Sequence, residues 1–487
     1  MADSMAYGRW LSANPEFEQQ GHHLLKEWEI TSRPFEKPDR AMLAHYEKTL
    51  GSEAGLFGAI VGDRRLLMGP DCTYSQDYRR RFTDDELLCI LQRGLEKMDF
   101  LFDTLKPDLV VSFVCVTVLD YLAYLFAHAR GVRVMNLRPT RVGDRVSFST
   151  YLNDPSPELA ASFKQIMDGC QTKDLDVARA YIKRVREQHG RYEGVVPPSA
   201  HPAIKVNTTR FTRLGGIVSA VRSYLSYRSS IASTDNHVPD PLRTLWFTAV
   251  RNPHRAKSAR FMLGSGYVKP EQLENFRYAF FPLHTEPEVS LLVYGRPYVN
   301  QLEIIRMLAM SLPVDMVLVV KEHPWMIGKR SLGAYKKMLN IPRVRLADPS
   351  IEARTLIGSA DLIVVVTGSV ALEAAMLGKP IITFGDCPYN LLPDSMVRRC
   401  DDPRRLHTII REALSDYVNN EKALESYVAA VYETSASVNL YSVLLGKKNV
   451  HSERSSDYSK EIQKLAYHLG AQLATTKLTI GPVTATW

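Results

Sequence analysis

Charged and small polar residues directly follow two apolar runs in the second half of the chain. The run 316–320 leads into Lys-Glu-His-Pro at 321–324, and the run 361–366 leads into Thr-Gly-Ser at 367–369. A cation, an imidazole and a glycine turn that opens a helix suit a phosphate, because glycine lets the backbone approach an anion and helix N-termini present oriented N–H groups. The pattern predicts an anion site formed by loops at the carboxyl ends of two neighbouring parallel strands.

Each candidate residue has an expected role. Lys321 and His323 supply a cation and an imidazole to the anion. Gly368 has no Cβ to obstruct the anion, and Ser369 can cap the helix and offer its hydroxyl to a phosphate oxygen. Glu373 lies one turn further on, where its carboxylate can accept hydrogen bonds from a ribose diol. The alternatives are a satisfied loop histidine at 323 and a solvated helix residue at 373.

Alternating strands and helices are expected to position these residues. From 277 onward the apolar runs are continuous, as in strands covered on both faces, and each is followed by a helical pattern. This alternation predicts a parallel, doubly wound α/β sheet. The expected strands are 277–283, 315–320, 343–346, 361–366 and 380–384, and the expected helices are 298–311, 331–340, 351–358, 369–377 and 403–416.

A second α/β pattern lies in the first half of the chain. Residues 109–127 are long and apolar enough to approach a membrane span, with Asp120 as the only ionisable charge. A central aspartate costs about 2.5 to 3.5 kcal/mol in a span. We therefore expect a strand at 109–114, a helix at 119–130 and a strand at 132–137 instead. The turn that follows contains Arg138 and Arg141. These arginines could face anionic groups, on an acceptor molecule or on the phosphates of a donor molecule. The alternative is a solvated turn.

Composition divides the chain into five expected parts. The stretch 229–241 is rich in Ser, Asn, Asp and Pro, as linkers are. The predicted parts are an N-terminal extension (1–55), a first Rossmann-like domain (56–233), a linker region (234–276), a second Rossmann-like domain (277–434) and a tail with a helix (435–487).

The chain resembles the capsule polysaccharide biosynthesis proteins. The matching segments are FPLHTEPE at 281–288, KEHP at 321–324 and TGSVALEA at 367–374. This family includes bacterial Kdo transferases and is similar, in its two-domain GT-B form, to bacterial sialyltransferases and CDP-glycerol polymerases. The resemblance extends over about 277–414, and more weakly over 56–149.

The resemblance implies a GT-B fold with two Rossmann-like domains that face a cleft. It also implies that His323 with Pro324, Thr367 and Ser369 hold the nucleotide phosphate, while the Thr-Gly-Ser turn leaves the base open. The expected function is a glycosyltransferase that moves a sugar from a CMP-linked acid sugar or an NDP-sugar to a growing surface or capsular polysaccharide. No metal or cofactor is expected, since Lys321, His323 and backbone N–H groups would stabilise the leaving phosphate.

The sequence also offers two candidate acid/base residues and leaves two other functions open. Glu286 and Glu288 follow the strand 277–283 and are candidates for contacting the sugar or for acid/base work. An epimerase or hydrolase on the same fold would use the same phosphate turn without an acceptor. A non-catalytic scaffold of a capsule assembly complex would bind no nucleotide.

Charge and cysteine content suggest the partners and the location. The chain has 487 residues and a formal net charge of +8, which favours nucleotide sugars, phosphorylated lipid carriers and anionic membrane surfaces. Nucleic acid is not expected, because no recognised binding motif supports the charge. The six cysteines are scattered, and the first eighteen residues lack the apolar core of a signal peptide. A cytoplasmic protein, peripheral at the inner face of the membrane, is therefore expected.

Overall fold

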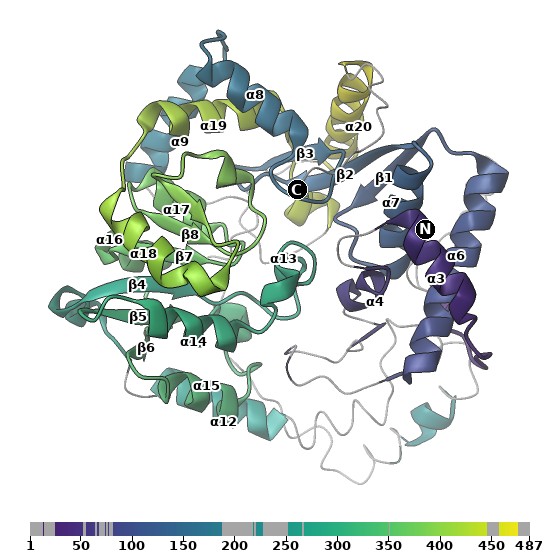
Figure 1. Ribbon diagram of the computed structural model, residues 1–487, viewed down its shortest axis with the longest axis horizontal. Helices are drawn as coiled ribbons and strands as arrows, with labels where there is room; N and C mark the ends of the chain where they lie inside the picture. Colours follow the sequence, from purple (N-terminus) through teal and green to yellow (C-terminus); the bar gives the residue numbers. More distant parts are fainter. Residues whose placement is uncertain are drawn as a thin grey trace.

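The computed structural model contains two α/β units, which Figure 1 shows side by side. It describes residues 13, 25–51, 55–63, 66–67, 74, 76, 81–187, 218, 221–226, 252–264, 267–349, 351–445 and 457–475. The predicted linker at 229–241 lies outside the described residues, as does most of the N-terminal extension before residue 25. Each unit is built around its own sheet, so the α/β fold class is confirmed.

The second unit holds a six-stranded parallel sheet with the order β6-β5-β4-β7-β8-β9. The chain starts in the centre of this sheet, moves to one edge, and then returns to build the other half. This order creates a topological switch point between β4 and β7, where ligands bind in doubly wound folds. The strands are β4 (Arg277–Pro282), β5 (Met316–Lys321), β6 (Val344–Leu346), β7 (Leu362–Val365), β8 (Ile381–Thr383) and β9 (Val397–Arg399).

Helices cover both faces of this sheet, so its strands are apolar on both sides. Along β4, Tyr278 and Phe280 belong to one buried cluster, and Ala279 and Phe281 belong to the other. This alternation explains why the sequence shows unbroken apolar runs rather than alternating ones. The helices are α13 (Val289–Leu292), α14 (Gln301–Ser311), α15 (Leu332–Leu339), α16 (Ala353–Ser359), α17 (Val370–Met376) and α18 (Leu406–Ser415), preceded by α12 (Asn252–Gly264).

The first unit has a smaller, mixed sheet with the order β1-β2-β3-β10. β1 (Leu109–Phe113) and β2 (Arg133–Pro139) are parallel and are connected by α7 (Val118–Ala129), whereas β3 (Arg145–Ser149) is antiparallel to β2. The segment 109–127 thus forms a strand, a turn and a helix, as expected. Among the described helices, none has the length and apolar character needed to cross a membrane. Among the described residues, this unit also contains the helices α3 (Arg40–Leu50), α4 (Gly58–Gly62) and α6 (Asp84–Leu105).

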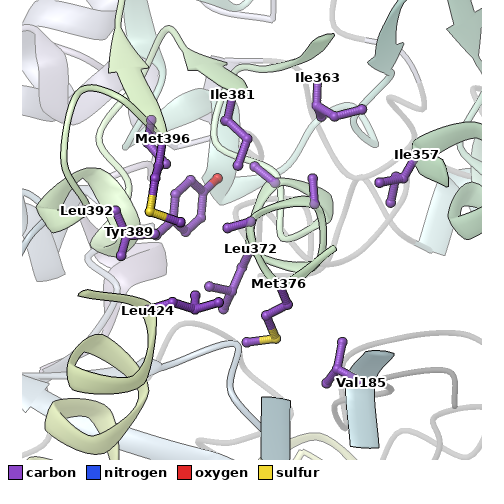
Figure 2. Packing of buried hydrophobic residues seen from close by; sticks show 14 of the residues in the cluster. Val185, Ile357, Ile363, Leu372, Met376, Ile381, Tyr389, Leu392, Met396 and Leu424 are labelled. Atoms are coloured by element: carbon purple, nitrogen blue, oxygen red, sulfur yellow. The ribbon is translucent and has the colours of Figure 1, made fainter. Parts of the chain in front are cut away.

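Two helices from the first half of the chain pack into the second unit. The helices α8 (Pro157–Met167) and α9 (Leu175–Glu187) pack against α19 (Glu421–Glu433), and all three contribute to a core of the second unit. Figure 2 shows Val185 of α9 and Leu424 of α19 near Leu372 and Met376 of α17. The domain boundaries stay a prediction, and this packing assigns part of 56–233 to the second unit's core.

The C-terminal tail, whose role the sequence left open, completes the first unit. β10 (Ala436–Ser437) pairs with β3 in antiparallel fashion. The helix α20 (Tyr458–Thr475) carries Leu465, Leu469 and Leu473, four residues apart, which pack against the buried side chains of β2 and β3. The tail therefore covers one face of the first sheet (Figure 1).

Candidate active site

The two loops that the sequence placed together are not on neighbouring strands. Lys321 ends β5 and residues 322–324 follow it, whereas residues 367–369 follow β7, and β4 lies between these strands. The expectation of direct neighbours was wrong, because strand order is set by the crossovers and not by the chain order. The residue that occupies the intervening position is His284, two residues after β4.

His284 links the ends of β4 and β7 at the switch point. Its Nε2 accepts a hydrogen bond from the backbone N–H of Thr367 at 3.4 Å, and its own backbone N–H donates to Oε1 of Gln301 at 2.7 Å. Burial, together with the positive charges of Arg141, His323 and Arg330, lowers the pKa of His284 to about 3. The ring is therefore neutral at physiological pH and acts as an acceptor towards the turn.

The carbonyl groups of the Thr-Gly-Ser turn are held by two side chains from different parts of the chain. Arg141 donates from Nη1 to the carbonyl oxygen of Thr367, and the hydroxyl of Tyr389 donates to the carbonyl oxygen of Gly368 at 2.6 Å. In a trans peptide the N–H points away from the C=O. These two bonds therefore direct the N–H groups of Gly368 and Ser369 to the opposite side of the turn, where an anion would have to lie.

The turn packs directly against His284. A Cβ at Gly368 would lie 3.4 Å from Cε1 of His284, which is an ordinary van der Waals contact. Thr367 is fully buried, and its hydroxyl donates to the carbonyl oxygen of Ser290 at 3.0 Å. The single hydroxyl proton of Thr367 is thus engaged with α13, so the structure places this side chain behind the turn rather than on its binding side.

Ser369 does not cap α17 through its side chain. It occupies the N-cap position with helical φ and ψ angles and makes no side-chain capping hydrogen bond. The expected cap was wrong because a capping side chain usually requires extended backbone angles at this position. Contact of the Ser369 hydroxyl with a phosphate stays a prediction.

His323 and Pro324 begin a short 3-10 helix, Pro324–Met326, at the end of β5. Nδ1 of His323 accepts the backbone N–H of Trp325 at 3.2 Å. A neutral imidazole that accepts at Nδ1 carries its proton on Nε2. The loop thus fixes one tautomer, in which Nε2 is a donor suited to a phosphate oxygen, and Pro324 supplies the fixed backbone angle of the first helical position.

Lys321 is directed away from the turn. Its ammonium donates to the carbonyl oxygen of Pro349 at 2.9 Å, in the loop after β6, and β6 flanks β5 on the side opposite to β4. The side chain is buried, and burial lowers the pKa of Lys321 to about 8. The structure therefore does not bring Lys321 together with Ser369, although both were predicted to hold the donor.

Replacing Lys321 with methionine is expected to change how stability depends on pH. The pKa of Lys321 is about 8 in the folded protein and near its ordinary value of 10.5 in the unfolded chain. The unfolded chain therefore binds more protons, so the cost of burying this ammonium is present below pH 8 and is relieved as the pH rises towards 10.5. Since one pKa unit corresponds to about 1.4 kcal/mol, the parent should gain about 2 kcal/mol relative to Lys321→Met between about pH 7 and about pH 9.5. Urea unfolding of both proteins measures this difference, and equal pH slopes would contradict the assignment.

The two candidate acid/base glutamates have different surroundings. Glu286 is buried, and its Oε1 accepts hydrogen bonds from Nη1 of Arg330 at 2.8 Å and from Nε2 of Gln301. Its Oε2 has no hydrogen-bond partner among the residues that the structure describes. Glu288 is half-buried and occupies the N-cap position of α13, without a side-chain capping bond. A role for either residue in the reaction stays a prediction, and the position of Glu286 favours a structural contact.

Glu373 pairs with an arginine of a neighbouring helix. The distance from its Oε1 to Nη1 of Arg354 is 3.6 Å, and both side chains remain about one-fifth exposed. Arg354 also donates to the carbonyl oxygen of Val185 at 2.6 Å. Glu373 is therefore not a purely solvated residue, and its carboxylate stays oriented while part of it remains accessible. The ribose contact stays a prediction.

The two candidate arginines of the first unit separate into a buried and a bridging residue. Arg138 is buried, forms an ion pair with Asp154, and donates to the carbonyl oxygen of Tyr151 at 2.8 Å. Its guanidinium also lies 5.4 Å from the ring centre of Tyr294 in the second unit. Arg141, in the connection between β2 and β3, reaches the turn itself. The structure thus brings Arg141, His323 and the turn to the carboxyl ends of the strands of the second sheet. It places Arg138 in a buried supporting position.

His284 and Arg330 have site roles that the sequence reasoning missed. His284 could have been found, because it directly follows an apolar run in the same way as residues 321–324 do. Arg330 lies in an irregular segment after the 3-10 helix, and its partners Glu286 and Glu322 come from two separate loops. No local pattern marks such a residue.

Comparison with known proteins agrees with the resemblance drawn from the sequence. Residues 266–393 match the family described as capsule polysaccharide biosynthesis protein. Protein FixF of Sinorhizobium fredii is 31% identical over 137 residues, which is 27% of this chain and 32% of FixF. The chain thus spans about a third of the length of this curated relative.

Solved structures that resemble the chain are distant. The β-Kdo 2,4 transferase of KpsC from Thermosulfurimonas dismutans has a TM-score of 0.34 and 15% identity, with 64% of this chain and 76% of that chain covered. The β-Kdo 2,7 transferase of the same protein has a TM-score of 0.36 and 11% identity, with 76% and 89% covered. UDP-GlcNAc 2-epimerase from Methanocaldococcus jannaschii has a TM-score of 0.24 and 17% identity, with 73% and 83% covered.

The family match and the candidate site coincide in the chain. The matched residues 266–393 include β4, β5 and β7 and the three loops that follow them. The predicted resemblance to the capsule polysaccharide biosynthesis proteins is therefore confirmed over the segment that forms the candidate site.

Proposed function

We propose that the protein is a glycosyltransferase that moves a sugar from a nucleotide-sugar donor to a growing bacterial surface or capsular polysaccharide. The observation that carries this proposal is the contact of Arg141 with the Thr367 carbonyl at the switch point of the second sheet. A nucleotide-binding turn on one unit and a guanidinium from the other converge there. A transferase needs such convergence, because donor and acceptor must be held together during the reaction.

The residues at this edge suit the chemistry of a departing nucleotide phosphate. As the bond between the sugar carbon and the phosphate oxygen breaks, a new bond to an acceptor hydroxyl oxygen forms, the hydroxyl proton passes to a general base, and negative charge develops on the phosphate. The N–H groups of Gly368 and Ser369 and Nε2–H of His323 can stabilise this charge, while Arg141 holds the turn through the Thr367 carbonyl. The proposal therefore needs neither a metal nor a cofactor, and it leaves Lys321 outside the binding side.

The substrates follow from the charge of the same groups. A cationic edge with several N–H donors favours a diphosphate-linked sugar or a CMP-linked acid sugar as the donor. A glycan, either free or linked to a lipid carrier, would be the acceptor. A cytoplasmic location at the inner face of a membrane stays a prediction from the net charge of +8.

Nucleotide binding tests the proposal before any product is known. We expect calorimetry with CMP, CDP, UDP and GDP, and with sugars linked to them, to find at least one ligand. Glu373→Gln should reduce its affinity by roughly 1.5 to 3 kcal/mol, because a charged acceptor of the ribose hydroxyls is lost. Glu303→Gln, which changes an exposed glutamate of α14, is the matched control and should bind as the parent does. Unchanged affinity in Glu373→Gln would remove Glu373 from the site, and a protein that binds no compound of the panel would contradict the proposed function.

A further inference from the structure

The guanidinium of Arg330 is buried between the loops that follow β4 and β5. Only 1% of its side chain is exposed. Nε donates to Oε2 of Glu322 at 2.7 Å, Nη1 donates to Oε1 of Glu286 at 2.8 Å, and Nη2 donates to the carbonyl oxygen of His284 at 3.3 Å. Every nitrogen of the guanidinium thus has an acceptor, and two of the acceptors are buried carboxylates.

Each of these acceptors is also connected to a site histidine. Glu322 accepts the backbone N–H of His323 through its other oxygen, Oε1, at 2.8 Å. On the β4 side, Gln301 donates to Oε1 of Glu286 and accepts the backbone N–H of His284. The two loops therefore belong to one buried hydrogen-bonded network, with Arg330 at its centre.

The network continues to the Thr-Gly-Ser turn at 367–369, which we call the donor turn. His284 receives the N–H of Thr367, so the turn after β7 is positioned by a histidine whose own backbone is fixed by Arg330. Buried charges are stable only when they are paired, so the partners of Arg330 must keep their positions. A lysine could offer a charge at this place, but it could not supply the planar fork that meets three acceptors at once.

Tyr74, from the first half of the chain, covers one face of the Arg330 guanidinium. The ring of Tyr74 lies 4.9 Å from the guanidinium carbon of Arg330, and it is buried against Met326 and Ala334. An aromatic ring over a guanidinium is favourable and also excludes water from the ion pairs beneath it. Tyr74 thus extends the network of the second unit to the first.

We infer that Arg330 is the positioning residue that sets His284 and His323 relative to the donor turn. This inference rests on the proposed function of the same site. Arg330 does not contact the donor, because its guanidinium is enclosed and fully used. It acts on turnover through the two histidines, and an error of about 1 Å in their positions can reduce the rate about 10²-fold.

The test compares Arg330→Lys with Arg343→Lys in the otherwise unchanged full chain. Arg343 donates to the carbonyl oxygens of Leu312 and Met316 near the opposite ends of the same strands, so it is a matched arginine far from the loops. The histidine rings of the ligand-free protein are observed by nitrogen-15 NMR, and their signals are assigned with His284→Gln and His323→Gln. We expect Arg330→Lys to shift the ring signals of both His284 and His323, and Arg343→Lys to shift neither.

A second variant keeps the inference testable if Arg330→Lys does not fold. The hydroxyl of Tyr335 donates only to the Glu322 side of the network, at 2.7 Å from Oε2. Tyr335→Phe should therefore shift the signal of His323 more than that of His284, which the network reaches through Arg330. Unchanged ring signals in a folded Tyr335→Phe protein, or in a folded Arg330→Lys protein, would overturn the inference.

Turnover separates this inference from the proposed function. Using the donor found in the nucleotide panel, we expect Arg330→Lys to lower kcat by about 10- to 100-fold while the dissociation constant for the free nucleotide changes less than about threefold. An equal loss of kcat in Arg343→Lys would indicate a merely structural effect and overturn the inference. Shifted histidine signals in a protein that binds no nucleotide would instead contradict the proposed function and leave the positioning role intact.

Discussion

Replacing His323 with alanine is expected to lower turnover about 10²- to 10³-fold while the fold remains intact. This is the range for the loss of one preorganised donor to a developing negative charge. The loop holds Nδ1 of His323 on the backbone N–H of Trp325, so Nε2 bears the proton that the leaving phosphate needs. Steady-state kinetics with the preferred donor measures the loss, and circular dichroism checks the fold.

His407→Ala is the matched control for this prediction. His407 lies exposed on α18, away from the loops that follow β4, β5 and β7. We expect this variant to turn over as the parent does. Parental turnover in a folded His323→Ala protein would remove His323 from the site, and the candidate phosphate donors would then be the N–H groups of the turn.

Gly385→Ala is expected to displace the donor turn by pushing against the side chain of Thr367. A Cβ at Gly385 would lie 2.5 Å from Cγ2 of Thr367 and 2.8 Å from the carbonyl oxygen of Tyr294, so one of them must move. Overpacking of this kind destabilises proteins by about 1 to 3 kcal/mol. Because Thr367 starts the turn, nucleotide affinity should also fall, by about tenfold for every 1.4 kcal/mol of lost binding energy. Urea unfolding and calorimetry measure the two effects.

Gly358→Ala provides a comparison with the same chemical change. Gly358 lies in α16, and a Cβ there would meet no atom within 4 Å. This variant should keep its nucleotide affinity and gain up to about 1 kcal/mol of stability, because alanine favours helices. If both glycine variants bound the nucleotide equally well, the turn after β7 would not be the binding element.

The strands β4 to β8 of the second unit could be predicted from the sequence, because most of these buried strands form unbroken apolar runs, whereas β9 (Val397–Arg399) contains two arginines and was missed. The run 361–366 became β7 at Leu362–Val365, and the helix expected at 331–340 became α15 at Leu332–Leu339. The helix expected at 298–311 starts later, at Gln301, after a short 3-10 turn. Such boundaries depend on local capping that apolar periodicity does not encode.

The residues that form the site could be predicted only in part. The sequence identified His323 and the turn, but it placed them on neighbouring strands, because residues close in a pattern were assumed to be close in the sheet. The order of the strands puts β4 and His284 between them. Arg330 could not be predicted, since its three acceptors are contributed by loops that are distant in sequence. Networks of this kind depend on tertiary packing and leave no local periodic signal.

The fate of a labelled sugar tests the proposed transferase most directly. The full chain would be incubated with CMP-, UDP- and GDP-linked sugars labelled in the sugar, together with a capsular glycan fragment as the acceptor. We expect the label to move to the glycan, with one nucleotide released for each sugar transferred. Recovery of the label as an altered or free sugar without growth of the glycan would contradict it and would indicate an epimerase or a hydrolase.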